Sequence, residues 1–144
     1  MTLPEPQLGL VISYSFLWHD EHREGLDEGR KDRPCVIVIA MRIDESGETI
    51  VRVAPVTHSQ PADPKIAIEL PLAVKRNLGL DDARSWVILD EYNEFTWPGY
   101  DLRPISRTAN RIDYGFLPPR LFKELRAKAV ALWHSGSRRP TPRD

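Results

Sequence analysis

The chain has 144 residues, a length that fits one compact domain with little to spare. Hydrophobic residues make up 41% and charged residues 28%, as in ordinary globular domains, so wholesale disorder, collagen and coiled coil are poor descriptions of it. No apolar run approaches the roughly 20 residues of a membrane-spanning helix, and the polar segment 1–7 lacks the pattern of a signal peptide. We therefore expect a cytoplasmic globular protein.

Charge is distributed unevenly along the chain. Residues 1–102 contain 10 Lys and Arg against 18 Asp and Glu, whereas residues 103–144 contain 10 against 3. Clustered basic residues raise the local potential and attract a polyanion or an acidic partner chain, even in a protein of net charge -1. The alternative interpretation is a solvated basic helix followed by a loose tail.

Apolar and β-branched runs predict a series of short strands, and thirteen prolines argue against a helical bundle. We expect strands at 8–16, 35–42, 49–56, 65–70 and 85–89, with the second and third forming a hairpin around Ser46-Gly47. The charged segment 17–33 is expected to be a long loop, 71–78 a short helix or turn ended by Gly79, and 92–104 irregular. Cys35, the single cysteine, lies in an apolar run and is expected to be buried, without a disulfide or a zinc site.

One strong helix is predicted near the C-terminus. It follows Pro118-Pro119, places Leu121, Leu125 and Ala129 at helical spacing and ends at Gly136. The predicted fold is mainly β (α+β): a small curled antiparallel sheet or barrel covered on one side by this helix. Residues 1–135 are expected to form one domain, and residues 136–144 a flexible basic tail.

Arg33 and Thr57 are the first candidate functional residues. Arg33 precedes the strand that starts at Cys35, and Thr57 follows the strand that pairs with it, so the hairpin can bring both to one edge. A guanidinium fork and a threonine hydroxyl are suited to holding a phosphodiester. The alternative is that Arg33 pairs with a nearby acid and Thr57 caps a turn.

The order of these motifs resembles the PemK/MazF family of toxin endoribonucleases from toxin–antitoxin systems. The similar features are a first strand opened by Gly9, a Gly-rich charged loop ending in Arg33-Pro34, a Val/Ile strand, the Pro-x-Thr turn Pro55-Val56-Thr57 and a C-terminal helix approached through proline. The resemblance covers about residues 8–134. It implies an SH3-like barrel that forms a homodimer, cuts single-stranded RNA without a metal or other cofactor and is inhibited by an antitoxin. It also implies that Arg33 and Thr57 take part in cleavage.

The chain departs from the family pattern in two places. The loop 17–33 is longer than usual, and an acidic-Gln-hydrophobic-Arg segment is replaced by residues 90–94, in which only Asp90 is a plausible counterpart. Glu91 and Glu94 are expected where RNA passes in family members, and their charge opposes phosphate binding. A non-catalytic RNA- or protein-binding barrel, or a toxin directed at a protein such as a topoisomerase, therefore remains an alternative function.

Attack of a ribose 2′-OH on the adjacent phosphate needs a proton acceptor and a cation near the phosphate oxygens. Arg33 supplies the cation, but it is a poor base because a guanidinium stays protonated at neutral pH. Histidine suits proton transfer, and the candidates are His58, His19 and His22. Each has the alternative of an ordinary surface histidine.

The remaining predictions concern the surroundings of this site. We expect Arg30, Lys31, Ser59 and Gln60, which flank the candidate catalytic residues in sequence, to contact RNA. The pair His19 and His22 lacks a third ligand, so no metal site is predicted. The expected partners are single-stranded RNA, a second copy of the chain and an antitoxin with an acidic segment.

Overall fold

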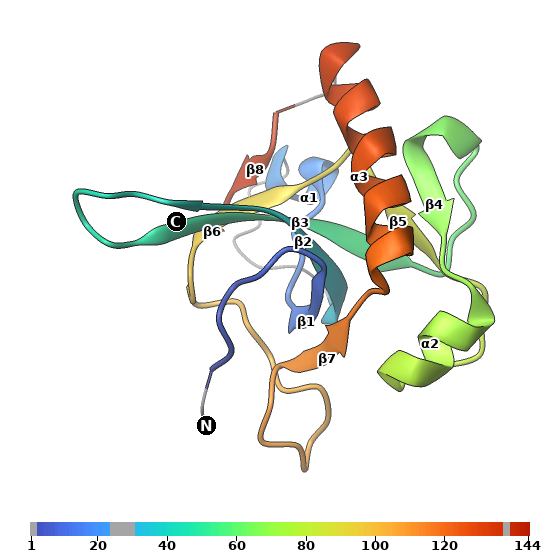
Figure 1. Ribbon diagram of the computed structural model, residues 1–144, viewed down its shortest axis with the longest axis horizontal. Helices are drawn as coiled ribbons and strands as arrows, with labels where there is room; N and C mark the ends of the chain where they lie inside the picture. Colours follow the sequence, from blue (N-terminus) through green and yellow to red (C-terminus); the bar gives the residue numbers. More distant parts are fainter. Residues whose placement is uncertain (1–2, 24–30, 137–138) are drawn as a thin grey trace.

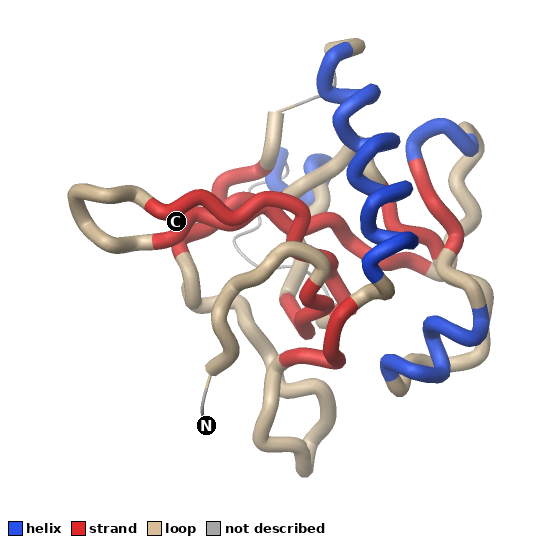
Figure 2. Tube along the Cα trace, viewed as in Figure 1, coloured by secondary structure: helices blue, strands red, loops and turns tan. Residues whose placement is uncertain are grey.

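The computed structural model describes residues 3–23, 31–136 and 139–144 of the chain (Figure 1). In chain order the elements are β1 (Leu10–Tyr14), α1 (His19–Arg23), β2 (Arg33–Arg42), β3 (Thr49–Thr57), the 3-10 turn η1 (Pro64–Ile66), β4 (Ala67–Glu69), α2 (Leu72–Leu78), β5 (Trp86–Ile88), β6 (Asn93–Thr96), β7 (Asp113–Phe116), α3 (Pro119–His134) and β8 (Thr141–Pro142). The predicted sequence of short strands followed by one long C-terminal helix is confirmed. In space, the helices lie on the outside of the strands (Figure 2).

The strands form one mainly antiparallel sheet. Its order is β4-β5-β3-β2-β1-β7, with β6 paired to β3 and β8 paired to β6 in parallel. Within the described residues β4 and β7, at the two ends of this order, do not pair with each other, so the sheet is open. No helix in the described part of the chain is long and apolar enough to cross a membrane.

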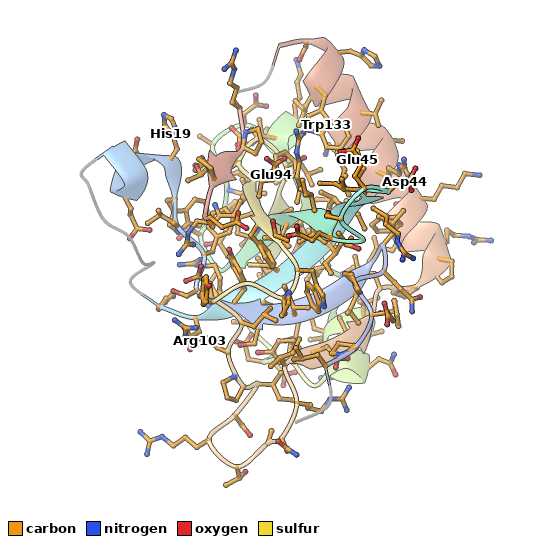
Figure 3. All side chains as sticks on the ribbon, turned by 90° about the vertical axis from the view of Figure 1, so that its left-hand side faces the viewer. His19, Asp44, Glu45, Glu94, Arg103 and Trp133 are labelled. Carbon is orange, nitrogen blue, oxygen red and sulfur yellow. The ribbon has the colours of Figure 1, made fainter. Side chains whose placement is uncertain are left out.

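The predicted hairpin is the centre of the sheet. Strands β2 and β3 pair with Cys35 opposite Pro55 and Val36 opposite Ala54, and the register shifts between Ile37 and Ile39. Such a bulge increases the local twist of the sheet. The turn of the hairpin ends at Gly47, whose φ of 74° favours glycine. Asp44 and Glu45, at the tip of the hairpin, are labelled in Figure 3.

The sheet is buried on both faces. Alternate residues of β1, β2 and β3 contribute to two separate apolar clusters: Val11, Val36, Val38, Ala54 and Val56 to one, and Leu10, Ile12, Cys35, Ile37, Val51 and Val53 to the other. Helix α3 adds Leu125 and Ala129 to the first cluster. This arrangement explains why the β2 sequence is apolar without alternation, and Cys35 is buried as expected.

The two longer helices begin and end where the sequence predicts. Helix α2 ends at Gly79, which adopts a left-handed conformation with φ 75°, and α3 begins at the predicted Pro118-Pro119 pair. Lys128 of α3 donates to the backbone oxygens of Pro64 and Ala67 at 2.9 and 2.6 Å, so the helix is held against η1 and β4.

The local structure departs from the sequence-based description in three places. The segment 92–104 is not wholly irregular, because β6 pairs with the first half of β3. The strand β7 was not predicted, since Gly115 interrupts its short sequence. Within the segment expected to be a long loop, residues 19–23 form the short helix α1.

Part of the C-terminal segment pairs with the sheet. Of residues 136–144, which we predicted to be flexible, Thr141 and Pro142 form β8 and Thr141 is buried. The guanidinium of Arg143 lies 2.9 Å from Asp101 Oδ1, donates to the Ser15 oxygen at 2.8 Å and lies over the Tyr14 ring. A buried ion pair therefore holds the described end of the chain to the sheet.

Candidate functional site

The hairpin brings Arg33 and Thr57 together. The pairing of β2 with β3 reaches Cys35 opposite Pro55, two residues from Arg33 at the start of β2 and two residues from Thr57 at the end of β3. Both line a cavity of about 300 Å³, which we call the Arg33 cleft. Its wall is completed by Lys31, Asp32, Pro34, Val56, His58, Lys75, Gly79, Leu80, Asp81, Ser85, Ile105 and Tyr114.

Arg33 is partly withdrawn from water. Its guanidinium lies 5.0 Å from the centre of the Trp18 ring, and Nη1 donates a long hydrogen bond of 3.5 Å to the Val56 oxygen. Burial lowers the pKa of Arg33 below its usual range, although Cys35 and Glu21 act in the opposite direction. The buried Nε atom has no hydrogen-bond partner among the described residues. A desolvated cation with unused donors interacts more strongly with an anion than an exposed one does.

Thr57 caps its own turn, as the simpler interpretation expected. Its Oγ1 accepts a hydrogen bond of 3.1 Å from the backbone N–H of Ser59. This contact fixes the position of the hydroxyl oxygen at the end of β3. A hydroxyl that accepts one hydrogen bond still has a proton to donate, so the cap is compatible with a contact to a phosphate oxygen.

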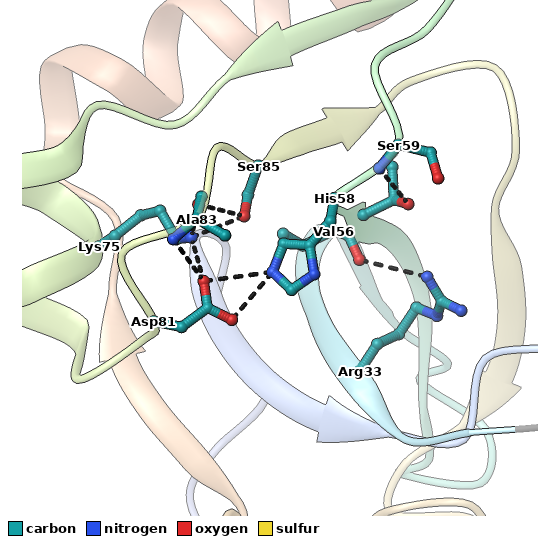
Figure 4. A network of polar contacts seen from close by, with 9 residues as sticks. Arg33, Val56, His58, Ser59, Lys75, Asp81, Ala83 and Ser85 are labelled. Carbon is teal, nitrogen blue, oxygen red and sulfur yellow. Dashed lines mark hydrogen bonds and ion pairs between the residues drawn. The ribbon is translucent and has the colours of Figure 1, made fainter.

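His58 lies in the same cleft, between Arg33 and Asp81 (Figure 4). Its Nε2 atom is 2.9 Å from Asp81 Oδ2 and 3.2 Å from Oδ1. Oδ1 of Asp81 also accepts from Lys75 Nζ at 2.7 Å and from the Ala83 N–H at 3.1 Å. A hydrogen bond from Lys75 holds the pKa of Asp81 below its usual range, with the charge of His58 acting in the same direction.

The sequence analysis missed Lys75 and Asp81. Lys75 is 2% exposed on the inner side of α2, and its ammonium donates to Ser85 Oγ at 2.7 Å and to the Ala83 oxygen in addition to Asp81. A signal was present, because Lys75 occupies the apolar side of a short helix, three residues before the buried Leu78. A lysine at such a position needs a partner for its charge.

A second cavity of about 410 Å³ also has Arg33 and Thr57 in its lining. We call it the Trp18 cavity; Trp18, Lys31, Ser59, Asp90 and Glu91 are among the residues that line it. The predicted site residues Lys31, Ser59 and Asp90 therefore line a cavity that shares Arg33 and Thr57 with the Arg33 cleft. The candidate Gln60 lies apart, in a cavity beside β4 and Lys128.

The other candidates are not part of these two cavities. His19 begins α1, lies at the edge of the molecule in Figure 3 and donates its backbone N–H to Glu91 Oε1 at 2.7 Å. The side chain of His22 and all of Arg30 lie outside the described residues. No group of three or more potential metal ligands occurs in the part of the chain that the structure describes.

The two acidic residues expected along the RNA path differ in position. Glu91 lines the Trp18 cavity. Glu94 lies on β6, opposite Arg52 on β3, and its Oε1 accepts from Arg52 Nε at 2.8 Å. Glu94 therefore faces a basic partner and is not among the residues that line either cavity.

The sequence matches no protein-family model and no curated protein.

Proposed function

We propose that the chain is a metal-independent endoribonuclease that cleaves single-stranded RNA at the Arg33 cleft. One observation carries this proposal: Arg33, Thr57 and His58 line one cleft, although they come from opposite ends of a hairpin. A fixed cation, a hydroxyl donor and a histidine are the groups that transfer of a phosphodiester to its own 2′-OH requires. The motif order that resembles the PemK/MazF family supports the same reaction.

In this reaction the 2′-oxygen attacks the adjacent phosphorus while its proton passes to His58. The bond between phosphorus and the 5′-oxygen breaks, and the 5′-oxygen takes up a proton from the cleft or from water. The products are a 2′,3′-cyclic phosphate and a 5′-hydroxyl. Arg33 stabilises the negative charge on the non-bridging oxygens, and Thr57 donates to one of them. Positioned acid–base groups accelerate such reactions about 10²–10⁴-fold.

The experiment is incubation of the purified protein with mixed-sequence single-stranded RNA in EDTA, followed by analysis of the product ends. We expect cyclic phosphate ends, loss of cleavage in Arg33→Ala, and no cleavage of the all-deoxy strand of the same sequence. Arg120→Ala, which changes an exposed arginine of α3, is the matched control and retains activity. Intact RNA, or equal cleavage by Arg33→Ala, refutes the proposal.

The same resemblance extends the proposal to biology and assembly. By this resemblance the antiparallel sheet is an open relative of an SH3-like barrel, the protein acts in the cytoplasm as the toxin of a toxin–antitoxin pair, and it forms a homodimer. An acidic antitoxin segment binds the basic C-terminal third. Sedimentation tests the dimer, and growth arrest upon expression, reversed by co-expression of a cognate antitoxin, tests the toxin.

A non-catalytic RNA-binding module is the second candidate. It is favoured by the use of Thr57 Oγ1 as a turn cap, because a hydroxyl in that role has a structural reason to be there without any part in cleavage. RNA that is retained intact, with binding weakened by Arg33→Ala, identifies this function.

A further inference from the structure

We infer that Lys75 and Asp81 are positioning residues that set His58 to act as a base through Nδ1. This inference rests on the proposed function for its chemistry, but the contacts that carry it are independent of RNA. They form a chain from the buried side of α2, through the loop after Gly79, to the end of β3 (Figure 4).

Asp81 is held in place before any ligand arrives. Its Oδ1 atom receives the Lys75 ammonium and the Ala83 N–H, so its orientation is fixed by a buried side chain and by a backbone turn. An ordinary exposed ion pair lacks this restraint and contributes little. Although His58 and Asp81 are each more than half exposed, their contact therefore has a defined geometry.

This geometry determines which ring nitrogen of His58 carries the proton. The pKa of Asp81 is depressed, so its carboxylate is ionised at neutral pH and can only accept hydrogen bonds. The neutral ring must then donate Nε2–H to Asp81, and Nδ1 keeps its lone pair. Nδ1 lies on the side of the ring that faces away from Asp81, toward Arg33 (Figure 4). It is the atom placed to take the proton of a 2′-OH whose phosphate is bound at Arg33.

Asp81 also stabilises the product of this proton transfer. Once Nδ1 has accepted a proton, the imidazolium lies 2.9 Å from a carboxylate oxygen, which offsets its new charge. Lys31, Asp32, Arg33, Lys75, Asp81 and Tyr114 are the other charged or titratable groups of the cleft. Three of them, Lys31, Arg33 and Lys75, are cations that repel a positive charge on His58, and the carboxylate of Asp81 offsets this repulsion.

The variant Asp81→Asn tests the inference because Lys75 dictates how the amide lies. Lys75 Nζ and the Ala83 N–H require an acceptor at the Oδ1 position, so the amide oxygen stays there. The amide nitrogen then occupies the Oδ2 position, 2.9 Å from His58 Nε2, and donates to it. The ring proton moves to Nδ1, and His58 can no longer accept a proton from the substrate.

The primary measurement is the ¹⁵N spectrum of the histidine rings of the full chain at neutral pH, with His58 assigned by the loss of its signals in His58→Gln. We expect protonated Nε2 in the wild type and protonated Nδ1 in Asp81→Asn. Lys75→Met, which removes the restraint on Asp81, is expected to give a mixture of both forms. Asp82→Asn is the matched control, because Asp82 pairs with exposed Arg76 and should leave the spectrum unchanged.

The second measurement is cleavage of single-stranded RNA by the same proteins. We expect Asp81→Asn to lower kcat by about 10²–10⁴-fold, as His58→Gln does, with KM little changed. The double variant should be no slower than either single variant, because the residues act as one unit. Thermal unfolding of each variant shows whether the fold is retained.

The two readouts separate the possible failures. Protonated Nδ1 in the wild type, or protonated Nε2 in Asp81→Asn, overturns the positioning of His58 whatever the protein does to RNA. A reversed tautomer with undiminished cleavage overturns the role of Nδ1 as the base. A wild type that leaves RNA intact but shows the expected tautomers refutes the proposed function, whereas the positioning of His58 by Asp81 and Lys75 stands.

Discussion

The buried contact between Arg143 and Asp101 gives the sharpest prediction about stability. The Arg143 side chain is 2% exposed and that of Asp101 11%, and their atoms are 2.9 Å apart. Arg143→Met keeps the length of the side chain but removes its charge and its hydrogen bonds to Ser15 and Asn93. Breaking a buried ion pair by removing one partner costs roughly 3–5 kcal/mol, because the other charge stays behind.

Urea unfolding of the wild type and Arg143→Met measures this loss directly. In thermal unfolding, a loss of about 1 kcal/mol lowers the Tm of a chain of this size by roughly 2–4 °C, so the expected drop in Tm is roughly 6–20 °C. Arg139→Met, which changes an exposed residue of the same tail, should leave Tm within about 2 °C. The double variant with Asp101→Asn should recover part of the loss, since the buried negative charge of Asp101 is removed as well.

A loss below about 1 kcal/mol in Arg143→Met refutes this reasoning. Such a result is what a surface pair gives, and it means that the tail does not dock on the sheet in solution. Equal losses in Arg143→Met and Arg139→Met refute it as well, because they attribute the effect to net charge instead of to the buried contact.

Three further predictions follow from other contacts. The buried Cys35 thiol, whose pKa burial raises, should react with a maleimide only as fast as the protein unfolds; rapid labelling of the native state contradicts this. The hydrogen bond from Lys75 depresses the pKa of the Asp81 carboxyl. The ionised carboxylate therefore stabilises the fold above a pH of about 4, and this stabilisation is lost as pH falls through the depressed pKa. The unfolding free energy of Asp81→Asn should accordingly depend less on pH in acid than that of the wild type. Gly99→Ala should cost about 1–3 kcal/mol, since φ is 68° and a Cβ would lie 2.9 Å from the Phe95 ring, whereas Gly47→Ala, with open space around it, should lose less in the same urea assay.

The central hairpin was predictable because its signals are local. A ten-residue strand, a turn with Gly47 and a second apolar run lie next to one another in the sequence, and their pairing fixes the position of Arg33 relative to Thr57. The C-terminal helix was predictable for the same reason, since its periodicity and its prolines lie within one segment. These two elements support the part of the candidate site that the sequence analysis identified.

The strands β6, β7 and β8 were not predictable because each depends on a distant partner. β6 is four residues long and includes the polar Asn93 and Glu94, yet its partners on β3 lie forty or more residues earlier in the chain. Asn93 is fully buried because its amide donates to the Leu17 oxygen and its Oδ1 accepts from the Leu17 N–H. A polar residue that is satisfied by the backbone of another segment has no local signature of burial.

The same limitation hid half of the candidate site. His58 follows Thr57 and was identified with it, but Asp81 and Lys75 reach it from a loop and a helix that the sequence separates from β3. Nothing in the local sequence relates the buried lysine of α2 to a histidine seventeen residues earlier. The contact exists because Gly79 ends α2 and turns the chain back toward the cleft.

The ion pairs explain how an acidic stretch of chain can contain a site for an anion. Residues 1–102 have a formal excess of eight negative charges, yet the carboxylates that line the cleft are engaged: Asp81 with Lys75 and His58, and Asp32 with Arg103. Arg33 differs, because its guanidinium lies on an aromatic ring and donates one long hydrogen bond to the backbone. The electrostatic potential at a bound phosphate depends mainly on the charges within a few ångströms and on whether each has an opposite charge beside it. At that distance Arg33 contributes more to the potential than the net charge of the segment does. The net charge of the sequence is therefore a poor guide to the charge of the ligand. The ion pairs formed within the cleft are a better guide.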